Sequence, residues 1–367
     1  MLLLLFAVVA GLHAVYVGAL ILGWFRLPPP PQAAGNAEID VVVAARNEAH
    51  RLPRLFASLQ AQTLPPSAVL IADDQSEDAT AECIEREHRG QPHVQRVSVP
   101  DGPGPRKKRA LTAGIQAATA PLLALTDADC QPLPHWLERL AAWHDAYPGS
   151  VLVGYGPLRA RSGLLNRFSR YETLVTAWLT AGAIGLGRPY MAVGRNLSYP
   201  RRLFERIGGF AHSQQSMSGD DDLLVQEVAR TGIAPVRYVL DPQAAVYSEA
   251  PATWRAWLHQ KRRHASAGRH YQPIAQAHLA LFQATHVATW LSPLLLGWPG
   301  LGVLAGLSLL RWGALGYAAH RLQESVSLGW IPVLDTLYAL YNLTVVPVGL
   351  LSPPKAWSHR QNSRPAG

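Results

Sequence analysis

The hydrophobic and polar positions divide the chain into two apolar ends and a mixed middle. Residues 1–27 are apolar except for the ionisable side chains of His13 and Arg26, and residues 271–352 are again rich in apolar positions. A helix of about 20 apolar residues is long enough to cross the hydrocarbon core of a membrane. We therefore predict an N-terminal transmembrane helix in residues 1–27. For residues 271–352 we predict a membrane region of two to three helices, with spans near residues 274–298, 301–319 and 330–351.

The other segments complete the predicted domain organisation. Residues 28–37 are rich in proline and suit a stiff linker. Residues 38–270 have the composition of an ordinary globular domain, and residues 353–367 form a basic tail. Within the globular domain, residues 164–187 are apolar enough either to lie on a membrane surface or to pack in the core.

The basic residues that flank the apolar ends predict the orientation. Arg26 follows the first apolar run and no lysine or arginine precedes it, whereas a cleaved signal peptide normally begins with basic residues. A basic cluster within residues 261–269 precedes the second apolar region. Since lysine and arginine are enriched on the cytosolic side, we expect a multi-pass protein of the cell (inner) membrane with a cytosolic middle domain. Three C-terminal spans would place the basic tail outside, so an interfacial or re-entrant segment is an alternative.

Two ionisable residues, Arg311 and Asp335, fall inside the C-terminal apolar region. A charged side chain at the centre of a membrane helix costs ~2.5–3.5 kcal/mol on insertion scales, so such residues usually pair or mark a path. We therefore expect Arg311 and Asp335 to pair with each other.

Within residues 38–270, short apolar runs alternate with segments of helical periodicity. Residues 52–59 place leucines and a phenylalanine at the spacing of one helix face. Ser76 is a candidate N-cap for a second helix, and residues 111–118 indicate a third. The apolar runs predict strands at residues 40–45, 69–72, 94–99 and 122–125. Strands that alternate with helices predict an α/β domain with a largely parallel sheet.

An acidic pair follows the last of these strands. Asp127 and Asp129 are separated by one small residue at the carboxyl end of the run, where open α/β sheets bind ligands. In an extended chain, two such carboxylates point to the same side. Mg²⁺ or Mn²⁺ would relieve their repulsion, because these cations prefer oxygen ligands and often share them with substrate phosphates. A metal site is therefore one interpretation, and a solvated turn is the other.

The ends of two other strands are expected at the same edge of the sheet. Asn47 and Glu48 follow the first strand directly after Ala45 and Arg46, and the second strand ends in two aspartates, Asp73 and Asp74. The carboxyl ends of parallel strands meet at one edge, so these polar groups should gather around one ligand.

A basic segment lies between the second acidic end and the third. Residues 101–109 are rich in glycine and proline and contain Lys107 and Lys108. A loop of this composition offers backbone N–H groups and cations to a diphosphate. The alternative is a solvated basic loop.

Three consecutive carboxylates, Asp220, Asp221 and Asp222, precede a helical pattern at residues 223–229. Acidic residues at a helix start are favoured by the helix dipole, so the triplet is compatible with a simple charged N-terminus. Three crowded acids also resist full ionisation, which would tune one of them as a general base near neutral pH.

Composition and charge exclude several classes of function. The net charge is +8, but no nucleic-acid-binding signature is present, and a membrane-apposed enzyme that handles phosphorylated substrates accounts for the excess. Cys83 and Cys130 do not make a disulfide framework and suit a reducing, cytosolic domain. The first strand is not followed by G-x-G-x-x-G, and the chain has no G-x-x-x-x-G-K-[ST], so neither dinucleotide nor P-loop binding is supported.

The order of these motifs resembles that of membrane-bound family-2 glycosyltransferases with the GT-A fold. That family usually shows an Arg-Asn-Glu after a valine-rich strand, an Asp-Asp-x-Ser, a Gly-Lys-rich loop, an Asp-x-Asp, a Glu-Asp or Asp-Asp pair and a Gln-x-x-Arg-Trp. Six similar motifs occur here in the same order over about 220 residues. They are found at residues 45–48, 73–76, 104–109, 127–129, 219–222 and 260–264.

The resemblance implies a role for each motif. Asp74, together with Asp73, would hold the uracil or ribose of a nucleotide-sugar, and Asp127 with Asp129 would hold the metal and the metal-bound diphosphate. Lys107 or Lys108 would approach the diphosphate, and Gln260 and Arg263 would steady it as it leaves. Asp221 would be the general base. The donor-binding residues implied in this way are Ala45, Asn47, Glu48, Asp73, Asp74, Lys107, Lys108, Asp127, Gln260, Arg263 and His264.

The resemblance also implies the reaction and its partners. An inverting hexosyltransferase of the cell envelope would use Mg²⁺ or Mn²⁺ to move a sugar from a nucleotide-sugar to a lipid-linked or glycan acceptor at the membrane. Two departures matter. His264 stands where the family usually has tryptophan, which weakens the alternative of a processive polysaccharide synthase, and Asp220 replaces the commoner glutamate, so Asp220, Asp221 or Asp222 is the base. A non-catalytic membrane scaffold is the third alternative.

Overall fold

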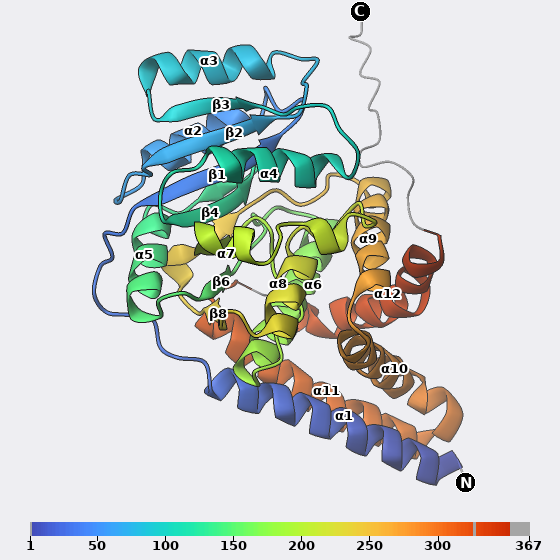
Figure 1. Cartoon of the computed structure of the whole chain (residues 1–367). Coiled ribbons are helices and arrows are strands. Elements are labelled where there is room, and N and C mark those ends of the chain that lie inside the picture. Colours follow the sequence, from blue (N-terminus) through green and yellow to red (C-terminus); the bar gives the residue numbers. More distant parts are fainter. Residues whose placement is uncertain (1, 326–327, 353–367) are drawn as a thin grey trace, which may run out of the picture.

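The computed structural model describes residues 2–325 and 328–352 of the chain. Two sheets form its β-structure. The larger contains β1 (Ile39–Ala45), β2 (Ala68–Asp73), β3 (Val94–Ser98), β4 (Leu122–Asp127), β6 (Val151–Gly154), β7 (Leu197–Pro200) and β8 (Val236–Val239). Its strand order is β3-β2-β1-β4-β7-β6-β8 (Figure 1). The smaller sheet pairs β5 (Gln131–Pro132) with β9 (Val246–Tyr247).

The first half of the large sheet is parallel. β1 pairs in parallel with β2 on one side and β4 on the other, so that Val42 lies between Leu70 and Leu125. β3 continues the parallel arrangement beyond β2. β7 is inserted antiparallel between β4 and β6, which makes the sheet mixed. All four predicted strands are present, and the predicted mainly parallel α/β sheet is confirmed.

Helices cover both faces of this sheet. Those of the globular domain are α2 (Leu52–Gln60), α3 (Thr80–Gly90), α4 (Arg106–Ala117), α5 (Trp136–Ala146), α6 (Leu164–Gly185), α7 (Arg201–Arg206), α8 (Asp222–Thr231) and α9 (Trp254–Ala267). The apolar helices are α1 (Leu2–Phe25), α10 (Pro273–Leu296), α11 (Trp298–Arg321) and α12 (Ile331–Leu351).

Alternate residues of β1 face different cores, as the period of a strand requires. Val41 and Val43 belong to the core that contains Leu55 of α2 and Trp136 of α5. Val42 belongs to the core on the other face, with residues of α4 and α6. Because both faces are covered, the strands are apolar runs without a polar alternation.

The start of α4 differs from the prediction. α4 begins at Arg106 rather than at residue 111, directly after Pro105, so Lys107 and Lys108 lie in its first turn and not in a loop. The buried positions Lys108, Leu111 and Ile115 continue one helix face through the basic tract. Because the first residues of α4 are basic, the helical periodicity of its buried positions was not visible in the sequence.

The start of α3 also differs from the prediction. Its N-cap is Ala79, whereas the expected cap, Ser76, donates its hydroxyl to Asp73 Oδ1 at 2.6 Å. Ser76 therefore stabilises the turn after β2 and not the helix.

α6 is a core helix that joins the sheet to the apolar helices. Gly23 of α1 and Gly182 of α6 approach so closely that a Cβ added at Gly23 would lie 2.0 Å from the carbonyl oxygen of Gly182. Trp24 Nε1 donates to the carbonyl of Trp178 at 2.9 Å. Of the two alternatives for residues 164–187, the structure supports core packing.

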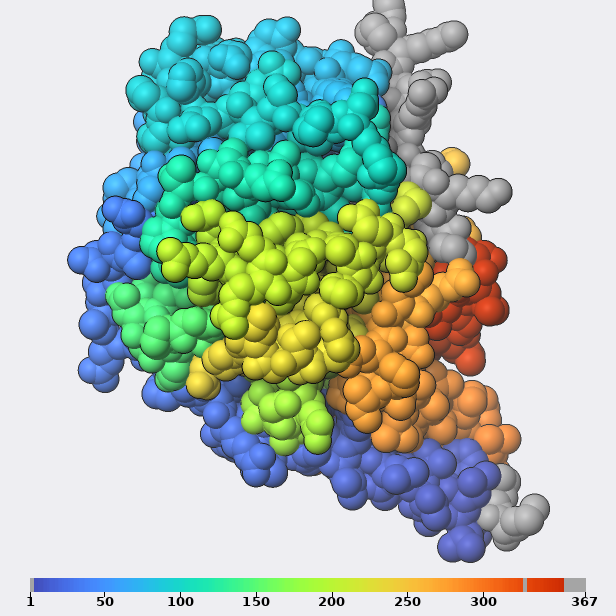
Figure 2. Space-filling view, viewed as in Figure 1, coloured from blue at the N-terminus to red at the C-terminus, as the bar shows by residue number. Residues whose placement is uncertain are grey.

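Within the described part of the chain, four helices are long and apolar enough to cross a membrane: Leu3–Phe25, Pro273–Leu296, Trp298–Arg321 and Ile331–Leu351. They match the predicted segments to within a few residues. Figure 2 shows α1 and α10 projecting beneath the globular domain. The expected pairing of Arg311 with Asp335 is confirmed, since the two form a buried ion pair. The predicted basic tail, residues 353–367, lies outside the described residues.

Candidate active site

The candidate site lies at the carboxyl edge of the parallel strands β1, β2 and β4. Ala45, the last residue of β1, is in register with Asp73 at the end of β2, and Ala44 is in register with Asp127 at the end of β4. The polar residues that follow these strands are therefore neighbours. This is the edge at which ligands bind in open α/β sheets.

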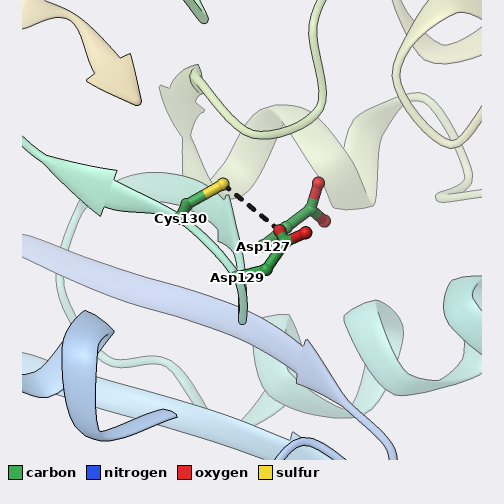
Figure 3. Close-up of side chains that lie close together, drawn as sticks. All are labelled: Asp127, Asp129 and Cys130. Atoms are coloured by element: carbon green, nitrogen blue, oxygen red, sulfur yellow. Dashed lines mark hydrogen bonds between the residues drawn. The ribbon is translucent and has the colours of Figure 1, made fainter. Parts of the chain in front are cut away.

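Asp127 and Asp129 form an acidic pair at the end of β4. Figure 3 shows their carboxylates side by side, with the thiol of Cys130 behind them. One ligand atom from each of the three residues lies within 4.8 Å of the others. Burial, and then the charge of Asp127, raises the pKa of Asp129. Burial raises the pKa of Cys130 far above its usual range, so this thiol stays protonated and contributes a weak S–H donor to Asp129 at 3.7 Å.

Lys107 connects the acidic pair to the aspartate triplet. Its Nζ atom lies 3.0 Å from Asp127 Oδ1 and 2.9 Å from Asp220 Oδ2. Burial opposes the charge of Lys107, but the carboxylates of Asp127 and Asp220 outweigh it and raise the lysine pKa. α4 reaches this position because Gly114 lets it pack closely on β1, where an added Cβ would lie 2.6 Å from Val42 Cγ1.

Lys108 has a different environment from Lys107. It is buried and donates to the carbonyl oxygens of Ser213 and Ser216 at 2.6 and 3.0 Å. Burial lowers its pKa to about 8. Lys108 therefore holds the segment around η1 (Ala211–Ser213) onto α4, and Lys107 is the lysine next to the carboxylates.

The three consecutive aspartates have separate partners. Asp220 faces Lys107. Asp221 caps α8 and accepts the backbone N–H groups of Asp222 at 2.8 Å and Gly194 at 2.7 Å. Asp222 accepts from the backbone of Ala192 and from the hydroxyl of Tyr271. Burial, and then Asp220, raises the pKa of Asp221 to about 6.

Arg195 is a site residue that the sequence analysis did not identify. It follows Gly194, which Asp221 holds, and its charge partly offsets the raised pKa of Asp129 and adds to the effect of Lys107 in lowering the pKa of Asp127. One of its terminal nitrogens donates to the carbonyl of Gly156. A single arginine in a loop carries no distinguishing signal in the sequence, and only the tertiary contact reveals it.

α9 brings its basic face to the same carboxylates. Arg263 is half-buried, and burial lowers its pKa, although Asp220 and Asp127 oppose that shift from nearby. Gln260 lies one turn earlier on α9, and His264 follows Arg263 on the exposed side of the helix. These three predicted residues therefore come from one helix, and Arg263 is the one whose charge acts on Asp127.

Asp73 and Asp74 differ in their hydrogen bonding. Asp73 is buried and accepts from Arg96 Nε and Nη2 at 2.9 and 2.7 Å and from Ser76. Its carboxylate is therefore engaged within the fold. Asp74 is also buried, and its carboxylate lies 3.9, 3.7 and 3.4 Å from the guanidinium groups of Arg46, Arg106 and Arg109. Burial raises the pKa of Asp74.

Asn47 and Glu48 shape the loop after β1. Asn47 adopts a left-handed conformation with φ of 56°, and its side-chain oxygen accepts the N–H of Glu77 at 2.7 Å. The N–H of Glu48 donates to Thr80 Oγ1 at 2.8 Å. Burial raises the pKa of Glu48 to about 7, and Arg51 lowers it, whereas the charge of Asp129 raises it further.

The donor set of this edge fits a divalent cation. Asp127 and Asp129 supply oxygen ligands, and the side chain of Asp127 is 36% exposed, so it remains accessible. Two carboxylates leave further coordination positions for water and for phosphate oxygens, as Mg²⁺ requires.

Comparisons with known proteins agree with this geometry. Residues 40–207 match the family Glycosyl transferase family 2. A Bacillus subtilis protein named "Probable glycosyltransferase YdaM" is 22% identical over 237 residues, which cover 62% of this chain and 54% of that protein. The pre-mycofactocin glycosyltransferase of Mycobacterium tuberculosis is 27% identical over 261 residues, which cover 68% of this chain and 50% of that protein. The chain thus spans about half the length of these relatives.

A solved structure shares the fold. A mannosyltransferase from Pyrobaculum calidifontis, determined in complex with GDP-Man and Mn²⁺, aligns over 95% of this chain and 99% of its own chain. The TM-score is 0.51 and the sequence identity is 22%, which shows a common fold. The resemblance of the motifs within residues 40–207 is thereby confirmed: these residues carry a glycosyl transferase family 2 domain, built on a GT-A-like fold.

Proposed function

We propose that the protein is a metal-dependent, inverting glycosyltransferase that moves a sugar from a nucleotide-sugar to a lipid-linked or other membrane-proximal acceptor. The observation that carries this proposal is the position of Lys107 between Asp127 and Asp220. The Lys107 ammonium group thus contacts both carboxylates. That of Asp127 suits a metal-bound diphosphate, and that of Asp220 suits an acceptor hydroxyl. Donor and acceptor chemistry would therefore meet around Lys107.

The donor side of the site would be built from the three strand ends. Asp74, rather than the internally bonded Asp73, is the carboxylate that we assign to the nucleoside. Lys107, Arg195 and Arg263 supply positive charge around the acidic pair, where a leaving diphosphate would gain negative charge. Fixed cations directed at developing charge lower the barrier of a group transfer because they need no reorganisation.

Asp127 and Asp129 would hold the Mg²⁺ or Mn²⁺ ion. The mannosyltransferase of the same fold was solved with Mn²⁺ and a nucleotide-sugar, which supports a divalent cation at this edge. When bound, the ion would supply Lewis-acid stabilisation of the departing diphosphate.

Asp220 is the residue that we assign as general base. Asp221 and Asp222 are committed to backbone N–H groups and to Tyr271, whereas Asp220 turns towards Lys107 and the acidic pair. In a direct displacement, the acceptor oxygen forms a bond to the anomeric carbon as the bond from that carbon to the diphosphate oxygen breaks. The hydroxyl proton passes to the carboxylate of Asp220, and the configuration at the anomeric carbon inverts.

Membrane attachment forms part of the proposal. Four apolar helices extend from the globular domain, and α1 packs directly on α6 beneath the sheet. An acceptor anchored in a lipid layer would approach the catalytic edge from the side of these helices. We propose that the catalytic domain lies on the cytosolic side of the cell membrane.

The decisive experiment measures nucleoside diphosphate release by the full chain in membranes. A panel of nucleotide-sugars is supplied with Mg²⁺, with Mn²⁺ or with EDTA, and the product length is determined. We expect metal-dependent release with at least one donor and loss of release in Asp129→Ala. Cys130→Ala is the matched control, because it removes a neighbouring side chain that is not an oxygen ligand. Full activity of Asp129→Ala, or equal activity in EDTA, would refute the metal assignment.

A further inference from the structure

The contacts of α12 differ from those of the other apolar helices. α1, α10 and α11 pack against one another, for example through the stacked rings of His13 and His286 and the hydrogen bond of Tyr16 to His278. α1 also packs on α6 of the globular domain, whereas α12 packs along α9 of that domain and contacts α10 and α6 as well. Figure 1 shows it beside α9.

The first end of α12 contacts the globular domain at the start of α6. The guanidinium of Arg167 lies 4.8 Å from the centre of the Trp330 ring, directly before α12 begins. One turn into α12, Asp335 accepts the hydroxyl of Tyr171 at 2.7 Å. The first end is therefore held at the level of the first turns of α6.

The second end of α12 contacts the globular domain as well. A Cβ added at Gly349 would lie 2.7 Å from the Cβ of Ala265, so α12 and α9 are in direct backbone contact there. Arg262 of α9 donates to the carbonyl of Ser352 at 2.8 Å. In the middle, the ring of Tyr341 meets the ring of Trp257 at 5.4 Å. A helix of 21 residues is about 32 Å long, yet both of its ends meet the same domain.

A single apolar face of α12 remains uncovered along its whole length. Its exposed large side chains lie at the spacing of one helix face and leave 47–82% of their surface open: Val333, Leu340, Leu343, Val348 and Leu351. A continuous apolar face of this length on a protein surface marks an interaction site. Its neighbours α10 and α11 expose leucines of the same kind, such as Leu291 and Leu309, so the face continues the apolar surface of the helices.

Basic side chains of the globular domain flank this face. Arg161, Arg167 and Arg170 line a pocket of about 190 Å³ together with Trp330 at the first end. Arg262 lies at the second end. An apolar helix face bordered by arginines and a tryptophan matches the boundary between acyl chains and anionic headgroups.

We propose that α12 does not cross the membrane but lies in its cytosolic interface, with its exposed face on the acyl chains. This inference rests on the membrane attachment in the proposed function. α12 would then hold the catalytic edge at a fixed height above the lipid, and Ser352 would lie on the catalytic side. Such a position also agrees with the basic character of residues 353–367.

A depth profile of single-cysteine variants tests this placement. Val333→Cys, Leu340→Cys and Val348→Cys carry a fluorophore in the reconstituted full chain, and lipids brominated at different acyl positions quench it. We expect all three positions to be quenched best by shallow bromines. Leu309→Cys in α11, at a position that is also exposed, is the control and should be quenched best by deep bromines. A profile on α12 that deepens at Leu340 and becomes shallow again at both ends would overturn the proposal.

Labelling from one side gives an independent readout. Ser325→Cys and Ser352→Cys are treated with a membrane-impermeant maleimide in sealed vesicles whose catalytic domain faces outward. The parent chain, in which Cys83 and Cys130 are buried, serves as the blank. We expect both variants to be labelled without detergent. Labelling of Ser352→Cys only after permeabilisation would refute the interfacial placement, whereas a chain that does not sediment with membranes would refute the proposed attachment itself.

Discussion

The ammonium group of Lys107 lies 2.9 Å from the carboxylate of Asp220, although the two residues belong to distant segments of the chain. Lys107 comes from the first turn of α4, and Asp220 precedes α8. The same ammonium also contacts Asp127 at the end of β4. Three elements thus converge on one cation, and this convergence defines the centre of the candidate site.

Replacing Lys107 should separate catalysis from folding. Lys107→Ala removes the cation nearest to the acidic pair, and we expect transfer activity to fall about 10²–10³-fold, the range for loss of one preorganised charge-stabilising group. Activity is measured as nucleoside diphosphate release at saturating donor. The neighbouring Lys108→Ala is the control. It leaves the carbonyls of Ser213 and Ser216 without their donor, so its main effect should be a loss of stability of about 1–3 kcal/mol. The reverse result would contradict the assignment of Lys107.

Asp220 and Asp221 of the aspartate triplet should have different roles, the first in catalysis and the second in stability. We expect Asp220→Asn to lower turnover about 10²–10⁴-fold while nucleotide-sugar binding persists, because a general base contributes to the chemical step. Asp221→Asn should instead lower the melting temperature, since one of the two N–H groups bonded to Asp221 would face an amide N–H₂ group. Single-turnover kinetics and donor titration distinguish the two effects. Retention of full turnover by Asp220→Asn would exclude it as the base.

Glu48 should make stability depend on pH when no divalent cation is bound. Its pKa is raised to about 7, above the ordinary value of 4.5, so the folded state holds a proton that the unfolded state releases. Stability attributable to Glu48 is therefore complete below pH 4.5 and declines as the pH rises to about 7. In EDTA, the free energy of unfolding of Glu48→Gln minus that of the parent should increase by about 2–3 kcal/mol from pH 4 to pH 8. This difference in the free energy of unfolding is measured by urea unfolding in detergent.

Arg51 provides the control for this pH effect. Its guanidinium lies 3.0 Å from the Glu48 carboxylate and lowers the pKa of that group. Arg51→Gln should therefore move the pH-dependent decline to higher pH without removing it. A stability difference between Glu48→Gln and the parent that is the same at pH 4 and pH 8 would refute the titration of Glu48.

The buried pair Arg311–Asp335 should respond to a charge swap. Both side chains are almost fully buried, and Asp335 also accepts from Tyr171 of α6. Removing one partner leaves an unpaired buried charge, so Arg311→Ala or Asp335→Ala should destabilise the protein by about 3–5 kcal/mol. The double variant Arg311→Asp with Asp335→Arg should recover part of this loss. Thermal unfolding in detergent is the measurement, and failure of the swap to exceed either single variant would show that the pair does not act as a unit.

Much of the fold was predictable because its signals are local. The strands β1, β2, β3 and β4 appear as apolar runs, and the pairing of Asp127 with Asp129 at a strand end depends only on the order of residues. The four apolar helices follow from hydropathy to within a few residues. The starts of α3 and α4 were exceptions, and that of α4 was missed because a basic tract on a half-buried helix conceals its periodicity until the buried face is known.

The roles of individual side chains were not predictable, because they depend on partners that are distant in sequence. Spacing alone could not tell Lys107 from Lys108 or Asp220 from Asp221, since neighbouring residues on a helix point in different directions and meet different segments. Arg195 joined the site only through packing. The sequence by itself determined the first four strands, their acidic ends and the apolar helices, because backbone periodicity encodes them. The tertiary structure decided which charges meet, and that α12 packs along α9, because those contacts arise only when separate elements bury one another's surfaces.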